Sequence, residues 1–184
     1  RLAGAIPSQI GQLSHLHIDL LLHSNDLSGT LPSQLGRLSR VRQLLAFDNS
    51  IAGTVPSEIG TLAHLTQLFL QSNRLQGSLP SQIGAVGGGV GFNVETLRRE
   101  KLPLHDLVIS DNRLTSELPR SLCNQTALRH FSASNNSFSG RVPPCRFPDV
   151  EVFDVASNRL TGPLPRVEGW GQGSYLLLHD NSLT

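Results

Sequence analysis

Apolar positions recur with a period of two in seven short segments of the chain, and each segment ends at an asparagine. Residues five and three positions before the asparagine are apolar, as Leu68 and Leu70 are before Asn73. A period of two predicts a short strand with one buried face. The asparagines in this register are Asn25, Asn49, Asn73, Asn112, Asn136, Asn158 and Asn181.

These segments belong to a longer repeat. The asparagines follow one another at steps of 24, 24, 39, 24, 22 and 23 residues, and most are followed by a glycine four residues on and a proline seven residues on, as Asn49 is by Gly53 and Pro56. A single short strand cannot bury its apolar face alone, so such units must stack. The pattern predicts about seven coils, each giving one strand to a parallel sheet.

The asparagine has a physical role at the end of each strand, where backbone groups lose their ladder partners. Its side-chain amide can both donate and accept hydrogen bonds. We expect it to point inward and to satisfy the turn backbone of neighbouring coils, because buried polar groups need partners.

The unit at residues 53–62, Gly-Thr-Val-Pro-Ser-Glu-Ile-Gly-Thr-Leu, followed by Leu65, Leu68, Leu70 and Asn73, resembles the plant-type leucine-rich repeat L-x-x-L-x-L-x-x-N-x-L-x-G-x-I-P-x-x-L-G-x-L. The resemblance covers nearly the whole chain. It implies a right-handed leucine-rich-repeat solenoid of the α/β superhelix class, with a concave parallel sheet of about seven short strands. It also implies a second short strand after each asparagine turn and 3₁₀ segments on the convex side.

Residues 1–184 are expected to form a single solenoid fragment that is cut within a repeat at both ends, because the paired cysteines and tryptophan of the family's N-terminal cap are not found. Ser116 replaces a repeat glycine, and Gln125 stands where leucine is expected. With the last two steps also short, these departures predict a less regular C-terminal third.

The 39-residue step contains an insertion at about residues 85–100. It begins with a glycine cluster and continues through Asn93 to Lys101, where one or two helical turns capped by Asn93 are expected. By analogy with the family, the segment should leave the solenoid on its convex side. A flexible excursion and a functional loop both remain open for it.

Charge and motifs exclude several function classes. The 15 basic and 14 acidic residues give a net charge of +1, and short aliphatic runs such as Leu176 to Leu178 fall far below the ~20 residues of a membrane span. We therefore expect no nucleic-acid binding and no membrane contact by this chain. The glycine cluster lacks a phosphate-loop lysine, and Ser110-Asp111-Asn112 lacks the companion motifs of a β-lactamase. The histidines lack metal-ligand spacing, so no enzyme activity, metal or cofactor is expected.

Two cysteines and two sequons bear on the compartment. Cys123 and Cys145 each lie thirteen residues before an asparagine of the repeat, so neighbouring coils place them side by side. A disulfide and a pair of free buried thiols are both consistent with this position. Asn124 and Asn135 begin N-glycosylation sequons, although chance occurrence is the alternative.

Residues six, four and two positions before each asparagine should point away from the core onto the concave face. Apolar residues dominate the first half of this face and polar residues the second, so a contiguous protein or peptide interface is one interpretation. Simple strand preference, or contact with another domain, is the other. The candidate ligand-binding residues are Leu21, Gln43, Leu45, Phe47, Gln67, Phe69, Gln71, Val108, His130, Asp154 and Tyr175.

The leading hypothesis is a non-catalytic recognition scaffold, part of a receptor-like ectodomain that binds a protein, peptide or glycan on its concave face. The resemblance adds a co-receptor as a candidate partner and places the chain outside the cell or at its surface, in a membrane-anchored parent protein. A secreted hydrolase inhibitor similar to polygalacturonase-inhibiting proteins is one alternative. An intracellular scaffold is the other, and it would keep both thiols free and both sequons unmodified.

Overall fold

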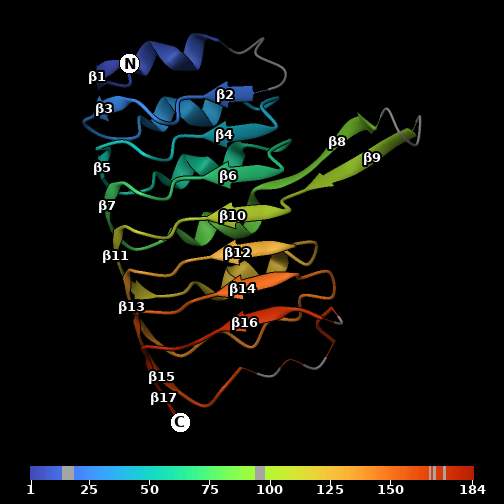
Figure 1. The fold of residues 1–184 in the computed structure, drawn as a ribbon. Coiled ribbons are helices and arrows are strands. Elements are labelled where there is room, and N and C mark those ends of the chain that lie inside the picture. The colour runs from blue at the N-terminus through green and yellow to red at the C-terminus, as the bar shows by residue number, and fades with distance from the viewer. Residues whose placement is uncertain (14–18, 94–97, 166, 168, 172) are drawn as a thin grey trace.

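The stacked coils predicted from the repeat are present in a computed structural model of the protein (Figure 1). The structure describes residues 1–13, 19–93, 98–165, 167, 169–171 and 173–184, with only the backbone for residues 90–93 and 98–102. Within this part, seven short strands form one parallel sheet in the spatial order of their coils. They are β2 (Asp19–Leu21), β4 (Gln43–Leu45), β6 (Gln67–Phe69), β10 (Asp106–Val108), β12 (His130–Ser132), β14 (Val152–Asp154) and β16 (Tyr175–Leu177).

A second run of parallel strands follows the asparagine turns, as the family resemblance implies. Strand β1 (Ala3–Ala5) pairs with β3 (Asp26–Ser28), and the remaining strands form a separate sheet. That sheet contains β5 (Ala52–Gly53), β7 (Arg74–Gly77), β11 (Arg113–Glu117), β13 (Ser137–Gly140), β15 (Arg159–Gly162) and β17 (Ser182–Leu183).

The return path of the first coils contains 3₁₀ helices, each of which begins directly after a proline. Proline fixes an extended entry, and its carbonyl accepts the first turn bond, as Pro56 O does from Ile59 N at 3.1 Å. In the described residues these helices are η1 (Ser8–Gln12), η2 (Ser33–Arg37), η3 (Ser57–Thr61), η4 (Ser81–Ala85) and η5 (Arg120–Asn124).

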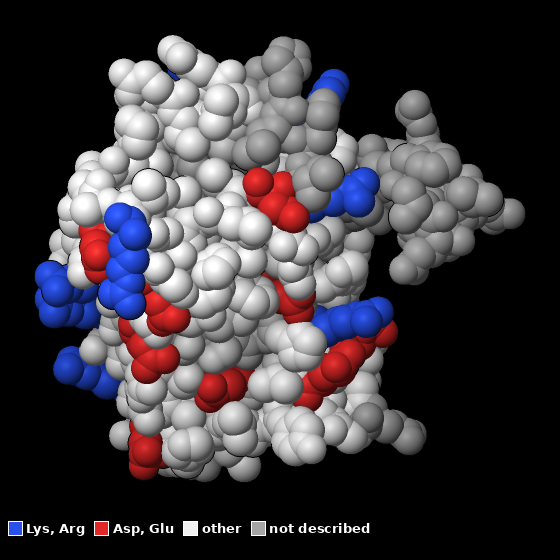
Figure 2. All heavy atoms as spheres, turned by 45° about the horizontal axis from the view of Figure 1, so that its top comes forward, with Lys and Arg blue, Asp and Glu red and all other residues white. Residues whose placement is uncertain are grey.

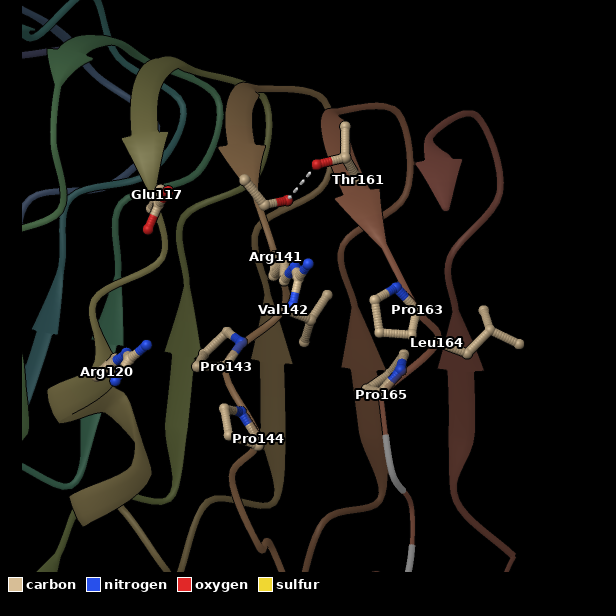
Figure 3. A pocket seen from close by; sticks show the side chains of 11 residues that line it. Glu117, Arg120, Arg141, Val142, Pro143, Pro144, Thr161, Pro163, Leu164 and Pro165 are labelled. Carbon is tan, nitrogen blue, oxygen red and sulfur yellow. Dashed lines mark hydrogen bonds between the residues drawn. The ribbon is translucent and has the colours of Figure 1, made fainter. Parts of the chain in front are cut away.

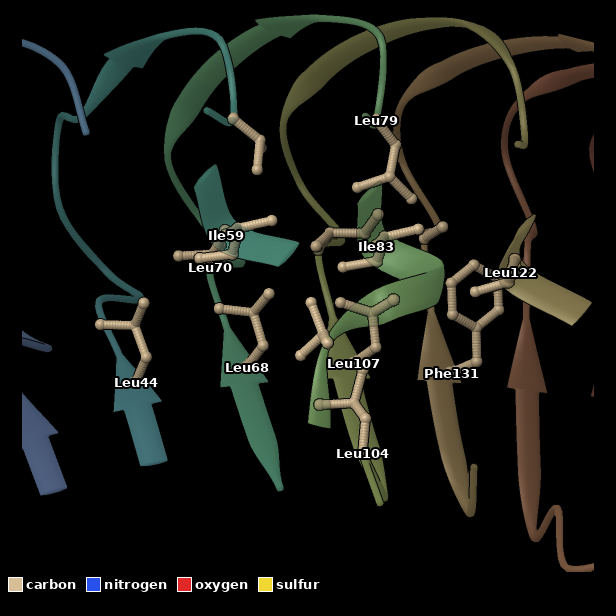
Figure 4. Close-up of a cluster of buried hydrophobic side chains, with 14 of the residues drawn as sticks. Leu44, Ile59, Leu68, Leu70, Leu79, Ile83, Leu104, Leu107, Leu122 and Phe131 are labelled. Atoms are coloured by element: carbon tan, nitrogen blue, oxygen red, sulfur yellow. The ribbon is translucent and has the colours of Figure 1, made fainter. Parts of the chain in front are cut away.

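The core fills the space between the seven-stranded sheet and the 3₁₀ segments. Leu44, Leu68 and Leu107 occupy one register across their strands and are fully buried. Ile83 on η4 and Leu122 on η5 lie in the same cluster (Figure 4). Each such leucine contributes roughly 1.5 to 3 kcal/mol by leaving water, so the apolar columns of the repeat are what hold adjacent coils together.

Each repeat asparagine bridges neighbouring coils. The Asn73 side chain donates to Ala46 O of the preceding coil at 2.9 Å and to Leu70 O and Gln71 O of its own coil at 3.2 Å. Its oxygen accepts from Ile51 N at 2.9 Å. The same arrangement recurs from Asn25 to Asn181, so these residues form a continuous structural ladder.

Left-handed backbone conformations close each turn. Gly53 has a φ of +74°, and a Cβ there would lie 2.8 Å from the methyl carbon of Thr30 in the coil before. Conformation and packing therefore both demand glycine at this position. Ser116, which replaces the repeat glycine one coil after the insertion, adopts the same left-handed region with a φ of 70°.

The insertion is a β-hairpin, so the helix expected between Asn93 and Lys101 is wrong. Strand β8 (Gly87–Asn93) pairs antiparallel with β9 (Arg98–Pro103), and residues 94–97 of that prediction lie outside the described residues. The antiparallel pairing of the two backbones outweighs the weak local capping signal, although glycine is a poor strand former. The hairpin leaves from the flank where the concave strands begin, between η4 and β10, rather than from the middle of the convex face (Figure 1).

The C-terminal third is less regular. Residues 141–147 have no regular secondary structure, and no 3₁₀ helix follows η5 in the described part of the chain. Aromatic side chains fill the space there: Phe131 and Phe153 have ring centroids 5.1 Å apart, and Trp170 lies 4.9 Å from Phe153. Large rings in the core compensate for coils that are one or two residues short.

Candidate functional site

The candidate residues lie on the outward face of the seven-stranded sheet. Alternation along β6 buries Leu68 completely, while Gln67 and Phe69 on either side of it stay partly exposed. Because the strands are in register, outward side chains of successive coils stand in columns, such as Leu45 beside Phe69 and Phe69 beside Val108. The sheet therefore presents fixed rows of side chains to solvent.

The first half of this face carries an apolar row, which we define as Leu21, Leu45, Phe47, Phe69 and Val108. Leu21 is 53% exposed, and the other members are half-buried. The rings of Phe47 and Phe69 lie 6.4 Å apart with a tilted geometry. Such a row is a surface that an apolar ligand side chain can cover.

His23 extends the apolar row and was missed by the sequence argument, which considered the histidines only as metal ligands. Its ring stacks on Phe47 with centroids 4.5 Å apart and an interplanar angle of 5°. His23 and Phe47 share the position two residues before the asparagine in adjacent coils. That shared position was the sequence signal that could have identified the pair.

The second half of the face carries a polar network. The Gln67 amide donates to Asp106 Oδ2 at 2.6 Å, and His130 Nδ1 contacts Asp106 Oδ1 at 2.5 Å. The other ring nitrogen of His130 lies 3.5 Å from Glu151 Oε2. Asp106 was not predicted, although it stands in the same column as Gln67 and His130, and its side chain is only 11% exposed.

Asp154 lies next to this network on β14. Its carboxylate accepts from Ser132 Oγ at 3.1 Å and from Ala156 N at 3.0 Å. We define Asp106, Glu151 and Asp154 as the acidic patch. Glu151 and Asp154 belong to one coil, two strands away from Asp106, and His130 on the strand between them contacts both Asp106 and Glu151.

Three other predicted residues lie on the same face with different surroundings. Gln43 is half-buried in register between Asp19 and Gln67. The Gln71 side-chain oxygen is buried without a hydrogen-bond partner. Tyr175, on β16, is 69% exposed, in register with Val152.

One histidine beside the network has a perturbed protonation equilibrium. Burial, followed by the Arg129 guanidinium, lowers the pKa of His105 below its usual 6.5, while Asp106 and Asp149 act in the opposite direction. Its backbone carbonyl also accepts from the amides of Arg129 and His130 at 2.8 and 3.1 Å. His105 is therefore a structural residue at the start of β10 that favours its neutral form.

The cysteines and sequons lie away from the concave face. Cys123 and Cys145 form a disulfide between adjacent coils, with Cα atoms 4.6 Å apart. Asn124 is exposed at the end of η5. Asn135 is exposed at the opposite end of the strands, and its amide donates to Asp111 Oδ1 at 2.8 Å. Both sequon asparagines are accessible for modification.

A separate hollow of about 750 Å³ lies where the ridge of 3₁₀ helices ends. Pro143, Pro144, Pro163 and Pro165 line it, together with Arg120 and Arg141 (Figure 3). It opens between the second sheet and the return segments, so it is not part of the concave face.

On the face in Figure 2, charged side chains stand singly or in small groups rather than as one basic field. Among the described residues, no three His, Cys, Asp or Glu side chains are grouped to hold a metal ion. Within the same residues, no helix combines the length and apolar character that a bilayer crossing requires.

Residues 64–86 and 103–125 match the Leucine Rich Repeat family. Receptor-like protein 7 of Arabidopsis thaliana is 32% identical over 77 residues, which cover 41% of this chain and 8% of that protein. The LRR ectodomain of the Arabidopsis thaliana membrane receptor kinase GASSHO1/SCHENGEN3, solved in complex with CASPARIAN STRIP INTEGRITY FACTOR 2, is 35% identical with a TM-score of 0.86. That similarity covers 100% of this chain and 20% of the receptor chain.

The Arabidopsis receptor kinase HAESA, solved with the peptide hormone IDA and the co-receptor SERK1, is 25% identical with a TM-score of 0.83. The similarity covers 100% of this chain and 28% of that structure. The chain thus spans less than a third of each of these relatives.

Proposed function

We propose that this leucine-rich-repeat solenoid is a non-catalytic binding scaffold, part of a receptor-like ectodomain that binds a protein or peptide on its concave face. The observation that carries the proposal is the apolar row beside the polar network on one rigid sheet. An exposed apolar strip with an aromatic centre and a polar rim has the character of a protein interface.

The sheet restricts how a ligand can be recognised. Backbone groups of β4, β6 and β10 pair with the strands on both sides, so a ligand cannot add a strand there. Recognition must use the outward side chains, whose positions are fixed by the buried columns beneath them. A fixed surface loses little conformational entropy on binding, which favours affinity.

Partner and compartment follow from the relatives and the cysteines. HAESA was solved with both a peptide hormone and a co-receptor, and we extend both partner classes to this chain. The Cys123–Cys145 disulfide favours an oxidising compartment, so we place the protein outside the cell or at its surface. An intracellular scaffold would require these thiols to be free, and a hydrolase inhibitor remains the alternative within the secretory route.

The concave face is tested by substituting Phe69 with arginine. Phe69 is half-buried and points away from the core, so Phe69→Arg should leave the melting temperature nearly unchanged. Binding of peptides selected on the wild-type chain from a random library should fall at least about tenfold, as expected for the centre of an interface. The affinities of the wild type and of Phe69→Arg are measured by titrating the peptide over the surface-immobilised protein.

The matched control is Leu164→Arg, which places the same charge on an apolar side chain that is 61% exposed elsewhere on the molecule. It should leave peptide affinity intact. If Phe69→Arg binds as tightly as Leu164→Arg, the ligand site lies on another face.

A further inference from the structure

We propose that the hollow beside η5 is a second binding site, which takes a small organic acid with a flat apolar ring. The ring packs against the prolines that line the hollow, and the acid group binds two arginines at its edge. The hollow is not part of the concave face, so the two sites are independent and each can be tested without the other.

The hollow exists because the coil after η5 lacks a 3₁₀ helix. In the earlier coils, the repeat proline accepts a hydrogen bond from the amide three residues on, as Pro56 O does from Ile59 N. Pro143 O instead accepts from Cys145 N at 2.8 Å, which closes a tighter, three-residue turn. The shorter return path leaves a space of about 750 Å³ beside η5. Sites for small organic molecules have volumes in this range.

The walls of the hollow are held in place. Four prolines line it, and each fixes its own backbone φ angle. The Cys123–Cys145 disulfide ties the residue after Pro144 to η5, which forms the opposite wall. A ligand therefore meets a preformed surface that loses little conformational entropy on binding.

The hollow offers apolar surface that solvent can reach. Leu164 lies between Pro163 and Pro165 and is 61% exposed, although it is one of the larger apolar side chains of the protein. The proline rings beside it are flat and apolar as well. A ligand ring that covers these side chains removes apolar surface from water on both partners.

Two guanidinium groups in the hollow have no partner. Arg120 begins η5 and Arg141 directly follows β13, and their side chains lie on either side of Pro143 (Figure 3). Both residues are exposed, and within the described part of the chain neither forms an ion pair or a side-chain hydrogen bond. A guanidinium carries only donors, in a planar fork that matches the two oxygens of a carboxylate.

Glu117 supplies the one carboxylate among the described residues that line the hollow. Its side chain lies over Gly140, where a Cβ atom would come within 2.7 Å of Glu117 Oε1. It forms no ion pair with Arg120 or Arg141. The lining thus carries two positive charges against one negative charge, which favours an anion over a cation.

The apolar walls and the arginines together define the ligand. A carboxylate can accept two parallel hydrogen bonds from one guanidinium, and a second guanidinium can stack on the face of an aromatic ring. An inorganic anion would cover none of the apolar surface, and a neutral ring would leave both arginines unpaired. An aromatic acid such as 2-naphthoate combines the two groups that the hollow recognises.

The test is titration of the 184-residue chain with 2-naphthoate by isothermal titration calorimetry at pH 7.5 and low salt. Neutral 2-naphthamide and inorganic sulfate are the comparison ligands. 2-Naphthoate should bind at one site, at least about tenfold more tightly than either of them, because a charge-assisted hydrogen bond is lost in the amide and the apolar contact in sulfate. Equal affinity for the amide or for sulfate, or no binding of 2-naphthoate, would overturn the proposal.

Variants locate the binding site on the molecule. Arg120→Gln with Arg141→Gln should weaken 2-naphthoate binding at least about tenfold, and Leu164→Ser should weaken it as well. Arg74→Gln is the matched control, because Arg74 is an exposed arginine on β7 that does not line the hollow. All of these side chains are exposed, so the melting temperature should stay nearly unchanged in every variant.

An unaltered affinity in the double arginine variant, or an equal loss in Arg74→Gln, would show that the acid binds elsewhere and would overturn the proposal. Phe69→Arg on the concave face should leave 2-naphthoate affinity intact. A loss of peptide binding in Phe69→Arg therefore reports on the proposed function alone, and a loss of 2-naphthoate binding in the double variant reports on the hollow alone.

Discussion

At the scale of single residues, each repeat asparagine joins the turns of two neighbouring coils. Asn73 satisfies three carbonyls and one amide, its counterparts from Asn49 to Asn181 do the same, and Asn25 satisfies two carbonyls and one amide. The residue before the asparagine contributes as well: Ser72 and Asp111 adopt positive φ values of 56° and 53°. Serine, aspartate and asparagine tolerate that conformation better than most residues, which explains why these types recur there.

Replacing Asn73 by leucine should lower the free energy of unfolding by about 1 to 3 kcal/mol, because backbone groups of two coils would stay buried without partners. Urea denaturation followed by circular dichroism measures the loss. Asn124→Ala, at an exposed asparagine on η5, should change stability by less than about 0.5 kcal/mol. Equal effects of the two substitutions would contradict the ladder's role.

The protonation of His105 should make stability depend on pH. Its pKa is lowered in the folded state, mainly by burial and then by Arg129, against the opposing carboxylates of Asp106 and Asp149. Below its ordinary pKa of 6.5 the unfolded chain then binds more protons than the folded chain, so stability falls as the pH drops through this value. The decrease levels off once the pH is below the folded pKa.

The measurement compares unfolding free energies at pH 7.5 and 5.5 in the wild type and in His105→Gln. Carboxylates titrate in both proteins, so only the difference between them reports on His105. The wild type should lose more stability between these pH values than the variant. An identical loss would remove His105 as a contributor.

At the scale of elements, the hairpin is built into the coil that carries it. Gly87 N donates to Leu62 O at 3.0 Å, and Gly89 N donates to Ala63 O at 2.6 Å. In the preceding coil, Leu65 N closes the turn by donating to Leu62 O. Val86 occupies the position of Leu62 in the next coil, but there the hairpin leads the chain away before it can close this turn. The side-chain amide of Gln125 instead donates to Val86 O at 2.9 Å and to Ile83 O at 2.8 Å.

Restoring the consensus leucine with Gln125→Leu should therefore destabilise the protein, by about 1 to 3 kcal/mol, because two buried carbonyls lose a donor. In a shortened chain without residues 88–102, the regular turn can reform, and the same substitution should cost little or become stabilising. The double-mutant cycle of unfolding free energies tests this coupling. Additive effects would show that Gln125 and the hairpin are independent.

The regular coils could be predicted from the sequence, whereas the hairpin and the contacts of Gln125 could not. Strand positions and the asparagine ladder follow from a period that repeats seven times, and the 3₁₀ return path follows from the family resemblance. The hairpin occurs once, so no repetition averages out its weak helical signal. Gln125 was recognised as a departure, but its partners could not be predicted, because they depend on a turn that the hairpin itself alters.

The candidate site also contains some residues that the sequence predicts and others that it does not. The columns of Phe69 and His130 follow from strand alternation alone. Asp106 follows from the same alternation and was overlooked, whereas its near burial depends on contacts with Gln67 and His130 from adjacent coils. Predicting contacts between coils requires the register of the strands as well as the period of the repeat.

At the scale of the whole molecule, stability is divided among neighbouring coils rather than held in one centre. The Cys123–Cys145 disulfide links the coil of η5 to one without a 3₁₀ helix. Its loop of 22 residues should contribute about 2 to 4 kcal/mol by restricting the unfolded chain. The bridge therefore strengthens the stack where its regular packing ends.

Cys123→Ala with Cys145→Ala should increase amide hydrogen exchange in β14 and β16 while leaving β2 and β4 protected. Mass spectrometry of peptides after deuterium labelling resolves these strands. The Asn124→Ala variant serves as the control, since it changes a neighbouring side chain and keeps the bridge. Uniform loss of protection along the solenoid would argue against independent coils.

The covalent link between two coils also has a mechanical consequence. A chain pulled from its two ends would peel apart coil by coil, since each coil is fastened only to the one before and the one after. The residues between Cys123 and Cys145 would withstand that tension and add no length to the stretched molecule. The bridge would therefore act as a stop against unravelling.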